Sequence, residues 1–549
     1  MLMNSPSVTA GTHTVFNQPP PLDPYNLFST DTSLKEALSP LSWAEPLLKD
    51  YGHLAGHEFF SAGFLANQNQ PLLRTHDRFG NRIDRVDFHP AYHQLMKSAI
   101  EHGLPSLPWS NTNPGAQVAR AAMMYLHNQV EAGTCCPLTM TFAAVPALNQ
   151  QPDLASRWLP LMTSRQYDPD DKPWYEKPGV TLGMAMTEKQ GGTDVRANTT
   201  RAVPLGKGGP GGLYALTGHK WFCSAPMSDG FLVLAQASKG LSCFLLPRWR
   251  EDGQRNGLHI QRLKDKLGNR SNASAEVEFQ EAHGWLIGEE GRGVHSIIQM
   301  VALTRFDCIT GSAALMRQAA AQAIHHCSYR QVAGKLLTEQ PLMENVLADL
   351  ALESEAALAF SLRVARSLDC PDDEYEQLFC RIATAIGKYW VCKRAPGHIN
   401  EAQECLGGAG YVEESILPRL YREAPVNSIW EGSGNVQCLD ILRTLQRQPD
   451  SLNVLFTELE KTSGADTQLD LCVTNLKNDL VNPANAHFQA RRLVEGLAIC
   501  LQASLLLQSG NALVASSFLR GRLDRVGLAY GTLPVGIACR DLIERARPR

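Results

Sequence analysis

The chain has 549 residues, of which 44% are hydrophobic and 19% charged, and its formal net charge is −4. This is an ordinary globular composition, which excludes wholesale disorder and a fibrous repeat, and the charge points to no particular partner. The length is too great for one core and predicts three or four domains of roughly 100–200 residues each.

The N-terminal residues give no sign of a targeting segment. The first thirty residues contain no Lys or Arg, and no apolar core precedes a small-residue cleavage site. We therefore expect a cytoplasmic protein without a secretory signal. The most apolar run, 497–507, is shorter than the about 20 residues that a bilayer requires, so it predicts a buried helix and no membrane span.

The fourteen cysteines show no paired spacing typical of a zinc site or a disulfide framework. We expect most of them to be reduced and buried, and we expect no metal.

Three regions follow one another in the first half of the chain. Residues 1–40 are rich in Pro, Ser, Thr and Asn, which predicts an extended N-terminal arm. Residues 41–179 show helical periodicity and predict a helical domain. Residues 180–290 contain short, closely spaced alternating runs, which predict a domain built as an antiparallel sheet or small barrel.

Helical patterns return in the second half. Residues 291–446 predict a helical bundle domain, and a polar connector then leads into a further helical domain over 451–549. The fold class predicted for the whole chain is α+β, mostly α.

A carboxylate that follows two apolar residues is the sharpest candidate for chemistry. Glu431 follows Ile429 and Trp430 and stands just before an apolar-periodic run that predicts a helix. Lost solvation beside these side chains would raise the pKa of Glu431 toward the range of a general base near neutral pH. The alternative is that Glu431 only complements the dipole of the following helix.

Two strand ends carry further candidates. The segment 186–194 places glycines and the hydroxyls of Thr187 and Thr193 where they could bind a planar polar ring or a phosphate. The segment 221–224 places an aromatic face two residues from the Ser224 hydroxyl. Taken alone, the first segment is more typical of an ordinary Gly turn and the second of a half-buried strand aromatic.

The C-terminal region is locally basic, since residues 511–549 hold seven Arg against three acidic residues, a net charge of +4. Guanidinium groups suit phosphate, so some of these side chains are candidates for binding DNA. The candidates are Arg491, Arg492, Arg520, Arg522 and Arg525. The alternative is an ordinary solvated face.

Five motifs in this order resemble the acyl-CoA dehydrogenase superfamily over roughly residues 100–445. They are Met186-Thr187-Glu188 with Thr193-Asp194, Lys220-x-Phe222-x-Ser224, Arg330, Gly407-Gly408-x-Gly410-Tyr411 and Trp430-Glu431-Gly432-Ser433. The resemblance implies an acyl-CoA dehydrogenase-like fold: an N-terminal helical domain, a middle antiparallel β domain and a C-terminal helical bundle, here with an extra C-terminal helical domain. Segments 12–21, 184–193, 262–274 and 427–435 further resemble a branch of the superfamily that belongs to the adaptive response to DNA alkylation.

The resemblance implies a non-covalent FAD. Thr187 would hydrogen-bond the pyrimidine side of the isoalloxazine, Ser224 would lie at N5 and Phe222 would lie against the ring. Arg330 would reach the diphosphate of an FAD held mainly by a neighbouring subunit, so we expect a homo-oligomer, a tetramer. The full set of expected cofactor contacts is Met184, Met186, Thr187, Gly192, Thr193, Phe222, Cys223, Ser224, Arg330, Gly407, Gly408, Trp430, Ser433 and Asn435.

By the same resemblance, Glu431 would remove the α-proton of an acyl thioester while hydride passes from the β-carbon to flavin N5. Two departures from the family pattern limit this chemistry. Ala333-Gly334-Lys335-Leu336 stands where the family usually has Phe-Gly then Pro, which removes an adenine-stacking aromatic. Trp430 stands where a Tyr is common and could narrow the acyl pocket.

We therefore expect an FAD-containing protein that binds double-stranded DNA without sequence preference and protects it during the response to alkylation. We expect only weak dehydrogenase activity on short branched-chain acyl-CoA. The alternatives are a metabolic acyl-CoA dehydrogenase and a flavin-dependent enzyme that repairs alkylated bases.

Overall fold

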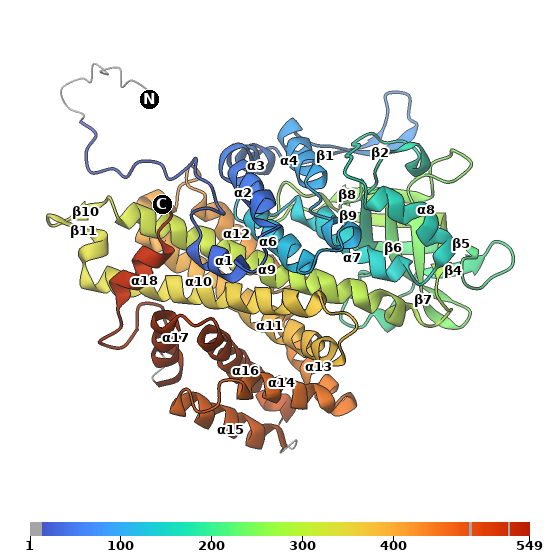
Figure 1. The fold of residues 1–549 in the computed structure, drawn as a ribbon. Helices are drawn as coiled ribbons and strands as arrows, with labels where there is room; N and C mark the ends of the chain where they lie inside the picture. The colour runs from blue at the N-terminus through green and yellow to red at the C-terminus, as the bar shows by residue number, and fades with distance from the viewer. Residues whose placement is uncertain (1–13, 482–485, 525–526) are drawn as a thin grey trace.

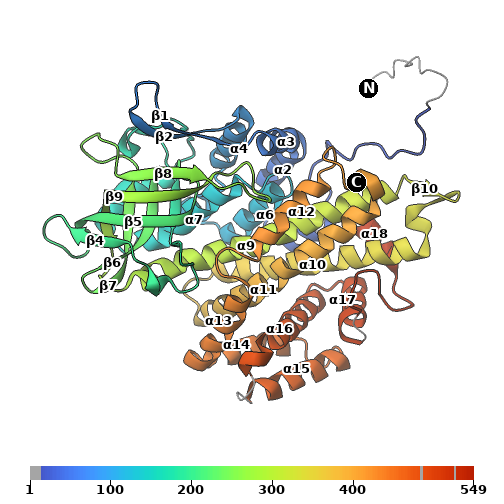
Figure 2. The same cartoon turned by 180° about the vertical axis from the view of Figure 1, so that it is seen from behind.

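The computed structural model describes residues 14–481, 486–524 and 527–549 (Figure 1). Most strands gather at one end of the molecule, long helices extend from them toward the other end, and one short hairpin lies at that far end. Figure 2 shows from behind that the C-terminal helices lie along one side of these long helices.

The N-terminal region is mainly helical. Its elements are α1 (Thr32–Leu38), α2 (Glu45–Leu54), α3 (Phe60–Gln68), β1 (Leu72–His76), β2 (Arg82–Asp87), α4 (Pro90–Glu101), α5 (Leu107–Ser110), α6 (Ala116–Asn128), α7 (Cys135–Leu148) and α8 (Pro152–Met162). Helix α6 is buried on all sides, and α7 nearly so, as expected for helices that pass through a core.

The sequence prediction of an extended arm over residues 1–40 is wrong at its C-terminal end, where α1 forms. Asp31 caps this helix by accepting a hydrogen bond from the Leu34 amide at 3.1 Å. Leu34 and Leu38 are buried in the main core, and Asp31 is ion-paired with Arg317 at 3.1 Å. Burial of these groups is what orders the end of the arm.

The hairpin β1–β2 was not expected within the helical region. It packs on the strand-rich domain, where Arg82 donates to the carbonyl of Ile260 at 2.8 Å and Val86 joins the barrel core.

The strand-rich domain is a small barrel. Its strands are β3 (Leu182–Ala185), β4 (Arg201–Pro204), β5 (Leu213–Ser224), β6 (Gly230–Ala237), β7 (Gly240–Pro247), β8 (Leu258–Leu263) and β9 (Ser274–Ile287). The ring β6–β7–β9–β5–β4 closes where Arg201 of β4 pairs with Gln236 of β6. Most neighbours are antiparallel, as predicted, but β3 and β4 both run parallel to β6.

Long helices form the other half of the scaffold. They are α9 (Gly293–Cys327), α10 (Pro341–Leu368) and α11 (Glu374–Cys405), followed by α12 (Leu417–Asn427) and α13 (Gly434–Arg447). The first three pack side by side, and a short hairpin, β10 (Gln331–Val332) with β11 (Lys335–Leu336), links α9 to α10.

The C-terminal extension comprises α14 (Asp450–Glu460), α15 (Thr467–Val481), α16 (Ala486–Gln508), α17 (Ala512–Leu519) and α18 (Cys539–Ala546). The run 497–507 lies in α16, and Leu497 and Leu501 are fully buried there, as the sequence predicted. Helix α18 returns to pack on α10. Within the described ranges, no helix combines the length and the apolar character needed to cross a membrane.

All fourteen cysteines are free thiols and most are buried, which agrees with the sequence prediction.

Candidate active site

Glu431 lies in the short connection between α12 and α13, in a left-handed backbone conformation with φ of 58°. A residue other than Gly rarely adopts this conformation unless its surroundings impose it. The Glu431 carbonyl accepts hydrogen bonds from Arg305 Nε at 2.9 Å and from Gln437 Nε2 at 3.1 Å. These contacts hold the backbone, and with it the direction of the carboxylate.

Among the residues that the structure describes, the carboxylate itself has one side-chain hydrogen-bond partner, since Thr304 Oγ1 of α9 donates to Glu431 Oε2 at 2.9 Å. Burial raises the pKa of Glu431, and the Thr304 hydrogen bond and the positive charges of Arg305 and Lys388 oppose the rise without cancelling it. A carboxylate with a raised pKa and a fixed direction is suited to accept a proton near neutral pH.

Lys388 fixes the segment that leads to Glu431. This buried side chain of α11 donates to the carbonyl of Trp430 at 2.9 Å and to that of Asn427. Both acceptors lie at or just beyond the C-terminal end of α12, where a cation complements the helix dipole.

The two strand ends predicted to bind a planar ring lie side by side. The Trp221 amide donates to the Thr187 carbonyl at 2.8 Å, which brings the segment after β3 against β5. Beneath them, Lys220 and Glu188 form a fully buried ion pair at 2.9 Å. Burial lowers the pKa of Lys220 to about 8, although Glu188 opposes this fall. The pair anchors the turn that carries Thr187.

Cys136, at the start of α7, connects these strand ends to Glu431. Its thiol lies within hydrogen-bonding reach of Ser224, and its pKa is raised to about 12 chiefly by burial, with the nearby Glu431 carboxylate adding to the rise. Met184, Cys136 and Trp430 pack in one apolar cluster. The structure therefore brings the strand-end candidates and Glu431 to one place.

The residues at this place fit a planar aromatic cofactor. The Phe222 ring is 53% exposed at the end of β5. Trp430 has a buried Nε1 donor with no partner among the described residues. A Cβ at position 192 would lie 2.4 Å from Thr187 Oγ1, so the glycine keeps this hydroxyl uncrowded. An exposed ring face, an unpaired donor and an uncrowded hydroxyl suit an isoalloxazine.

The remaining flavin candidates line the same region less directly. Met186 is partly buried beside Met184, and Cys223 is fully buried. Thr193 and Ser433 are exposed, the latter at the N-cap of α13. Asn435 Oδ1 accepts a hydrogen bond from Arg491 Nε at 2.8 Å.

Arg330, Gly407 and Gly408 lie at the opposite end of α9. From Thr304, which contacts Glu431, to Cys327 the helix extends about 35 Å at about 1.5 Å per residue. Cys327 Sγ contacts the Cys405 carbonyl at 3.7 Å, which places the turn at 407–410 beside this end. Arg330 NH1 donates to the Asn17 carbonyl at 2.8 Å. Within one chain these residues do not join the Glu431 group.

The structure contradicts one of the arginines predicted to bind DNA. Arg522 is largely buried and donates to Asp349 at 2.6 Å and to Glu353 at 2.8 Å. Its guanidinium therefore serves the packing of the C-terminal extension on α10 and does not face solvent. Arg525 lies outside the described residues.

The other candidates are at the surface. Arg491 and Arg492 are exposed on α16, and Arg492 is ion-paired with Asp479 at 2.8 Å. Arg520 is partly exposed and donates to the carbonyls of Val535 and Gly536.

Sequence reasoning missed the residues that hold Glu431. Three helices supply these residues, which are Thr304, Arg305, Lys388 and Gln437. The local sequence around them does not predict contact with Glu431. Lys388 alone could have been picked out as a candidate, because it interrupts a mainly apolar stretch in a predicted helix.

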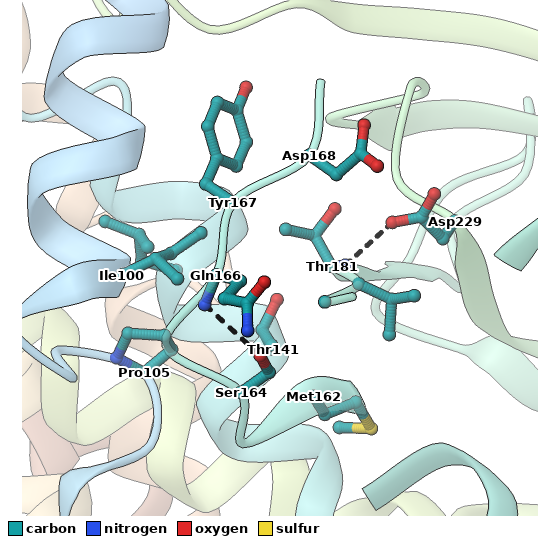
Figure 3. Close-up of a pocket in the computed structure, with 13 residues that line it drawn as sticks. Ile100, Pro105, Thr141, Met162, Ser164, Gln166, Tyr167, Asp168, Thr181 and Asp229 are labelled. Atoms are coloured by element: carbon teal, nitrogen blue, oxygen red, sulfur yellow. Dashed lines mark hydrogen bonds between the residues drawn. The ribbon is translucent and has the colours of Figure 1, made fainter. Parts of the chain in front are cut away.

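A small cavity between α4, α7, the end of α8 and the segment before β3 is separate from this site (Figure 3). Its lining includes Thr141, Asp168 and Asp229, and Asp229 Oδ2 accepts a hydrogen bond from the Thr181 amide at 2.8 Å. Its volume of about 10 Å³ is near the minimum for one water molecule. No candidate cofactor or base residue lines it.

Comparisons with known proteins define the class. Residues 183–282 match the acyl-CoA dehydrogenase middle domain, and residues 291–446 match the acyl-CoA dehydrogenase C-terminal domain. Residues 17–169 match the N-terminal domain of the adaptive response protein AidB. The fold is thus that of an acyl-CoA dehydrogenase, which confirms the predicted fold class.

The relatives narrow this class. AidB of Escherichia coli strain K12 is 49% identical over 478 residues, which cover 86% of this chain and 88% of that protein. The chain belongs to the AidB family of acyl-CoA dehydrogenases. The crystal structure of Caenorhabditis elegans ACDH-11 in complex with C11-CoA is 28% identical, with a TM-score of 0.84 over 94% of this chain and 92% of that one.

The cofactor is FAD, as predicted. An acyl-CoA dehydrogenase of Bacillus anthracis, solved in complex with FAD, has the same fold, with 16% identity and a TM-score of 0.64 over 83% of this chain and 81% of that one. The family membership and the residues gathered around Ser224 agree with this assignment.

Proposed function

We propose that this protein dehydrogenates an acyl thioester, with Glu431 as the base that removes the α-proton. The observation that carries the proposal is the Glu431 carboxylate, which is desolvated, aimed by a left-handed backbone and held by Thr304. FAD, when bound, would supply the hydride acceptor. The C11-CoA bound by the Caenorhabditis elegans relative supports acyl-CoA as the substrate class.

The preferred acyl group is short and branched. Trp430 precedes the base and packs against the apolar cluster that contains Met184, so its indole would take up space near the carboxylate. A pocket narrowed in this way would accept a compact acyl group and give slow turnover with long straight chains.

The test is anaerobic mixing of the FAD-loaded protein with a panel of acyl-CoA thioesters while flavin absorbance is followed. We expect at least one short branched thioester to bleach the flavin. Glu431→Gln should keep its FAD and show at least a hundredfold slower bleaching, since removal of a positioned base typically costs about 10²–10⁴-fold. Glu414→Gln, which alters an exposed carboxylate before α12, should behave as wild type. Equal bleaching by Glu431→Gln would refute the assignment.

A second function, sequence-independent binding of duplex DNA in the response to alkylation, is favoured by two observations. Arg491 and Arg492 present two exposed guanidinium groups from one turn of α16, and residues 17–169 match the N-terminal domain of the adaptive response protein AidB. Arg520 and, from sequence, Arg525 extend the candidate surface. The predicted cytoplasmic location would allow this contact and stays a prediction.

DNA binding is tested by titration of duplexes of different sequence at several salt concentrations. Each lost phosphate contact should reduce the salt slope by about 1, so Arg491→Ala with Arg492→Ala should reduce it by about 2 for all duplexes. An unchanged slope would count against this surface.

A tetramer in which neighbours share FAD sites would use Arg330 and the 407–410 turn. The support is their position at the far end of α9 from Glu431, where they are available to a neighbouring copy.

A further inference from the structure

Lys266, in the loop between β8 and β9, lies close behind the flavin-facing end of β5. Its Nζ donates to the Asn272 carbonyl at 2.6 Å and to Ser274 Oγ at 3.1 Å. Among the described residues, no carboxylate lies within ion-pairing distance of this ammonium group. Lys264, two residues earlier, is instead paired with Glu276 at 2.5 Å.

Two buried carboxylates near Lys266 are occupied by other donors. Glu423 of α12 accepts from the Asn269 amide at 2.6 Å and from its side chain at 2.8 Å. Glu131, before α7, accepts from the Thr134 amide at 2.7 Å and from Ser271. Their charges act on Lys266 without direct contact, so its positive charge is only partly compensated.

The hydrogen bonds from Lys266 have a defined direction. An ammonium group can only donate, so Ser274 Oγ accepts from it and keeps its own proton to donate. Ser224 Oγ lies 3.3 Å from Ser274 Oγ and would accept a hydrogen bond from the Ser274 hydroxyl. The Ser224 hydroxyl proton is then directed elsewhere.

Cys136 does not compete strongly for the Ser224 proton. Burial raises the pKa of this thiol to about 12, so it stays protonated, and a neutral thiol is a weak acceptor. The stronger acceptor available at the end of β5 is the ring nitrogen of the cofactor. This step rests on the placement of Ser224 at flavin N5 in the proposed function.

We propose that Lys266 is a positioning residue that orients Ser224 as a hydrogen-bond donor to the flavin through Ser274, and that its charge raises the reduction potential of bound FAD. Reduction places an electron pair on the isoalloxazine. A nearby cation in a medium of low dielectric constant stabilises that added negative charge.

The charge of Lys266 depends on pH in an accessible range. Burial lowers its pKa to about 8, while the carboxylates of Glu423 in α12 and Glu131 in the loop before α7 oppose this fall. Cys136, which faces it from α7, is a neutral thiol in this range. Its contribution to the potential should be present below that pKa and lost as pH rises through it.

The experiment measures the midpoint potential of the FAD-loaded protein by equilibration with a reference dye, without acyl-CoA. For Lys266→Met we expect the ratio of reduced to oxidised flavin at a fixed potential to fall at least tenfold, which is about 30 mV for a two-electron couple. Lys266→Arg keeps the charge and the donor and should stay within threefold of wild type. Lys264→Met removes a charge that Glu276 already balances, so its ratio of reduced to oxidised flavin should also stay within threefold of wild type.

Two further measurements keep the proposal open to refutation if Lys266→Met loses FAD. Ser274→Ala, which keeps the lysine, should lower the ratio by a smaller factor and alter the flavin absorbance spectrum. The wild-type potential should fall more steeply than that of Lys266→Arg between about pH 7 and pH 9. The proposal would be overturned if Ser274→Ala had the wild-type ratio of reduced to oxidised flavin and the wild-type spectrum, and if the potentials of wild type and Lys266→Arg fell equally steeply with pH. Because no thioester is present, failure of acyl-CoA dehydrogenation would leave these results unaffected.

Discussion

At the scale of single residues, the role of Glu431 depends on contacts made far away in the sequence. The residues from Ile429 to Gly432 indicate a desolvated carboxylate, and the structure shows one. The left-handed backbone and the hydrogen bond from Thr304 support the proposal of a positioned base over that of a simple partner of the α13 dipole. Since Thr304 is 127 residues away, no local sequence pattern could have supplied that support.

Thr304→Val tests the hydrogen bond to the base. Its hydroxyl stabilises the charged form of Glu431, so its loss should raise the pKa of Glu431 further. A base must be deprotonated to act, so the acid limb of the pH profile for flavin bleaching should move to higher pH. Stopped-flow rates across the acidic range measure this, and an unmoved limb would show that the contact is only structural.

Trp430→Phe tests the size of the acyl pocket. The smaller ring should increase the bleaching rate with a thioester one or two methylenes longer by roughly 10–200-fold relative to the short branched one. The measurement is the ratio of the two rates in each protein. A ratio equal to that of wild type would remove Trp430 from the control of specificity.

At the scale of elements, ion pairs of two arginines attach the C-terminal extension to the rest of the protein, although the sequence alone gave these arginines no acidic partner. Arg522 binds Asp349 and Glu353 of α10, and Arg545 of α18 binds Glu355 and Glu36. Their acidic partners are at least 169 residues away in the chain, so a local count of charges could not reveal them. The net charge of residues 511–549 therefore overstates the basic surface available to DNA.

Arg522→Ala should destabilise the protein by about 3–5 kcal/mol, because it leaves the buried Asp349 carboxylate without its cation and leaves Glu353 paired with Arg394 alone. Arg492→Ala, which breaks an exposed pair, should cost about 0–1 kcal/mol. Chemical denaturation followed by circular dichroism measures both. A near-zero cost for Arg522→Ala would contradict the buried network, and any loss of DNA binding in this variant must be judged against its stability.

At the scale of the whole molecule, the order of helical, strand-rich and helical regions could be predicted from periodicity. The strand-rich region predicted over 180–290 matches the span from the start of β3 to the end of β9 closely. Periodicity could not predict that β4 and β6 close the barrel or that β3 pairs in parallel with β6. The sequence of a single strand does not show which distant strand it pairs with. The β1–β2 hairpin was missed for the same reason, since its partner surface lies in the barrel.

The separation of Arg330 from Glu431 along α9 leads to a prediction about assembly. If neighbouring copies complete each other's FAD sites, dilution that dissociates the oligomer should release FAD. Flavin fluorescence and sedimentation velocity, measured on the same dilution series, should therefore change together. Arg330→Ala should shift FAD release to higher protein concentration, whereas retention of FAD by a monomer would contradict a shared site.

The most direct test of the central claim is exchange of the α-proton of a short branched acyl-CoA in deuterated water, followed by nuclear magnetic resonance. The FAD-loaded wild-type protein should exchange this proton with solvent, and Glu431→Gln should slow the exchange at least a hundredfold while it keeps its cofactor. Exchange at the wild-type rate in Glu431→Gln would show that another group removes the proton and would contradict the account.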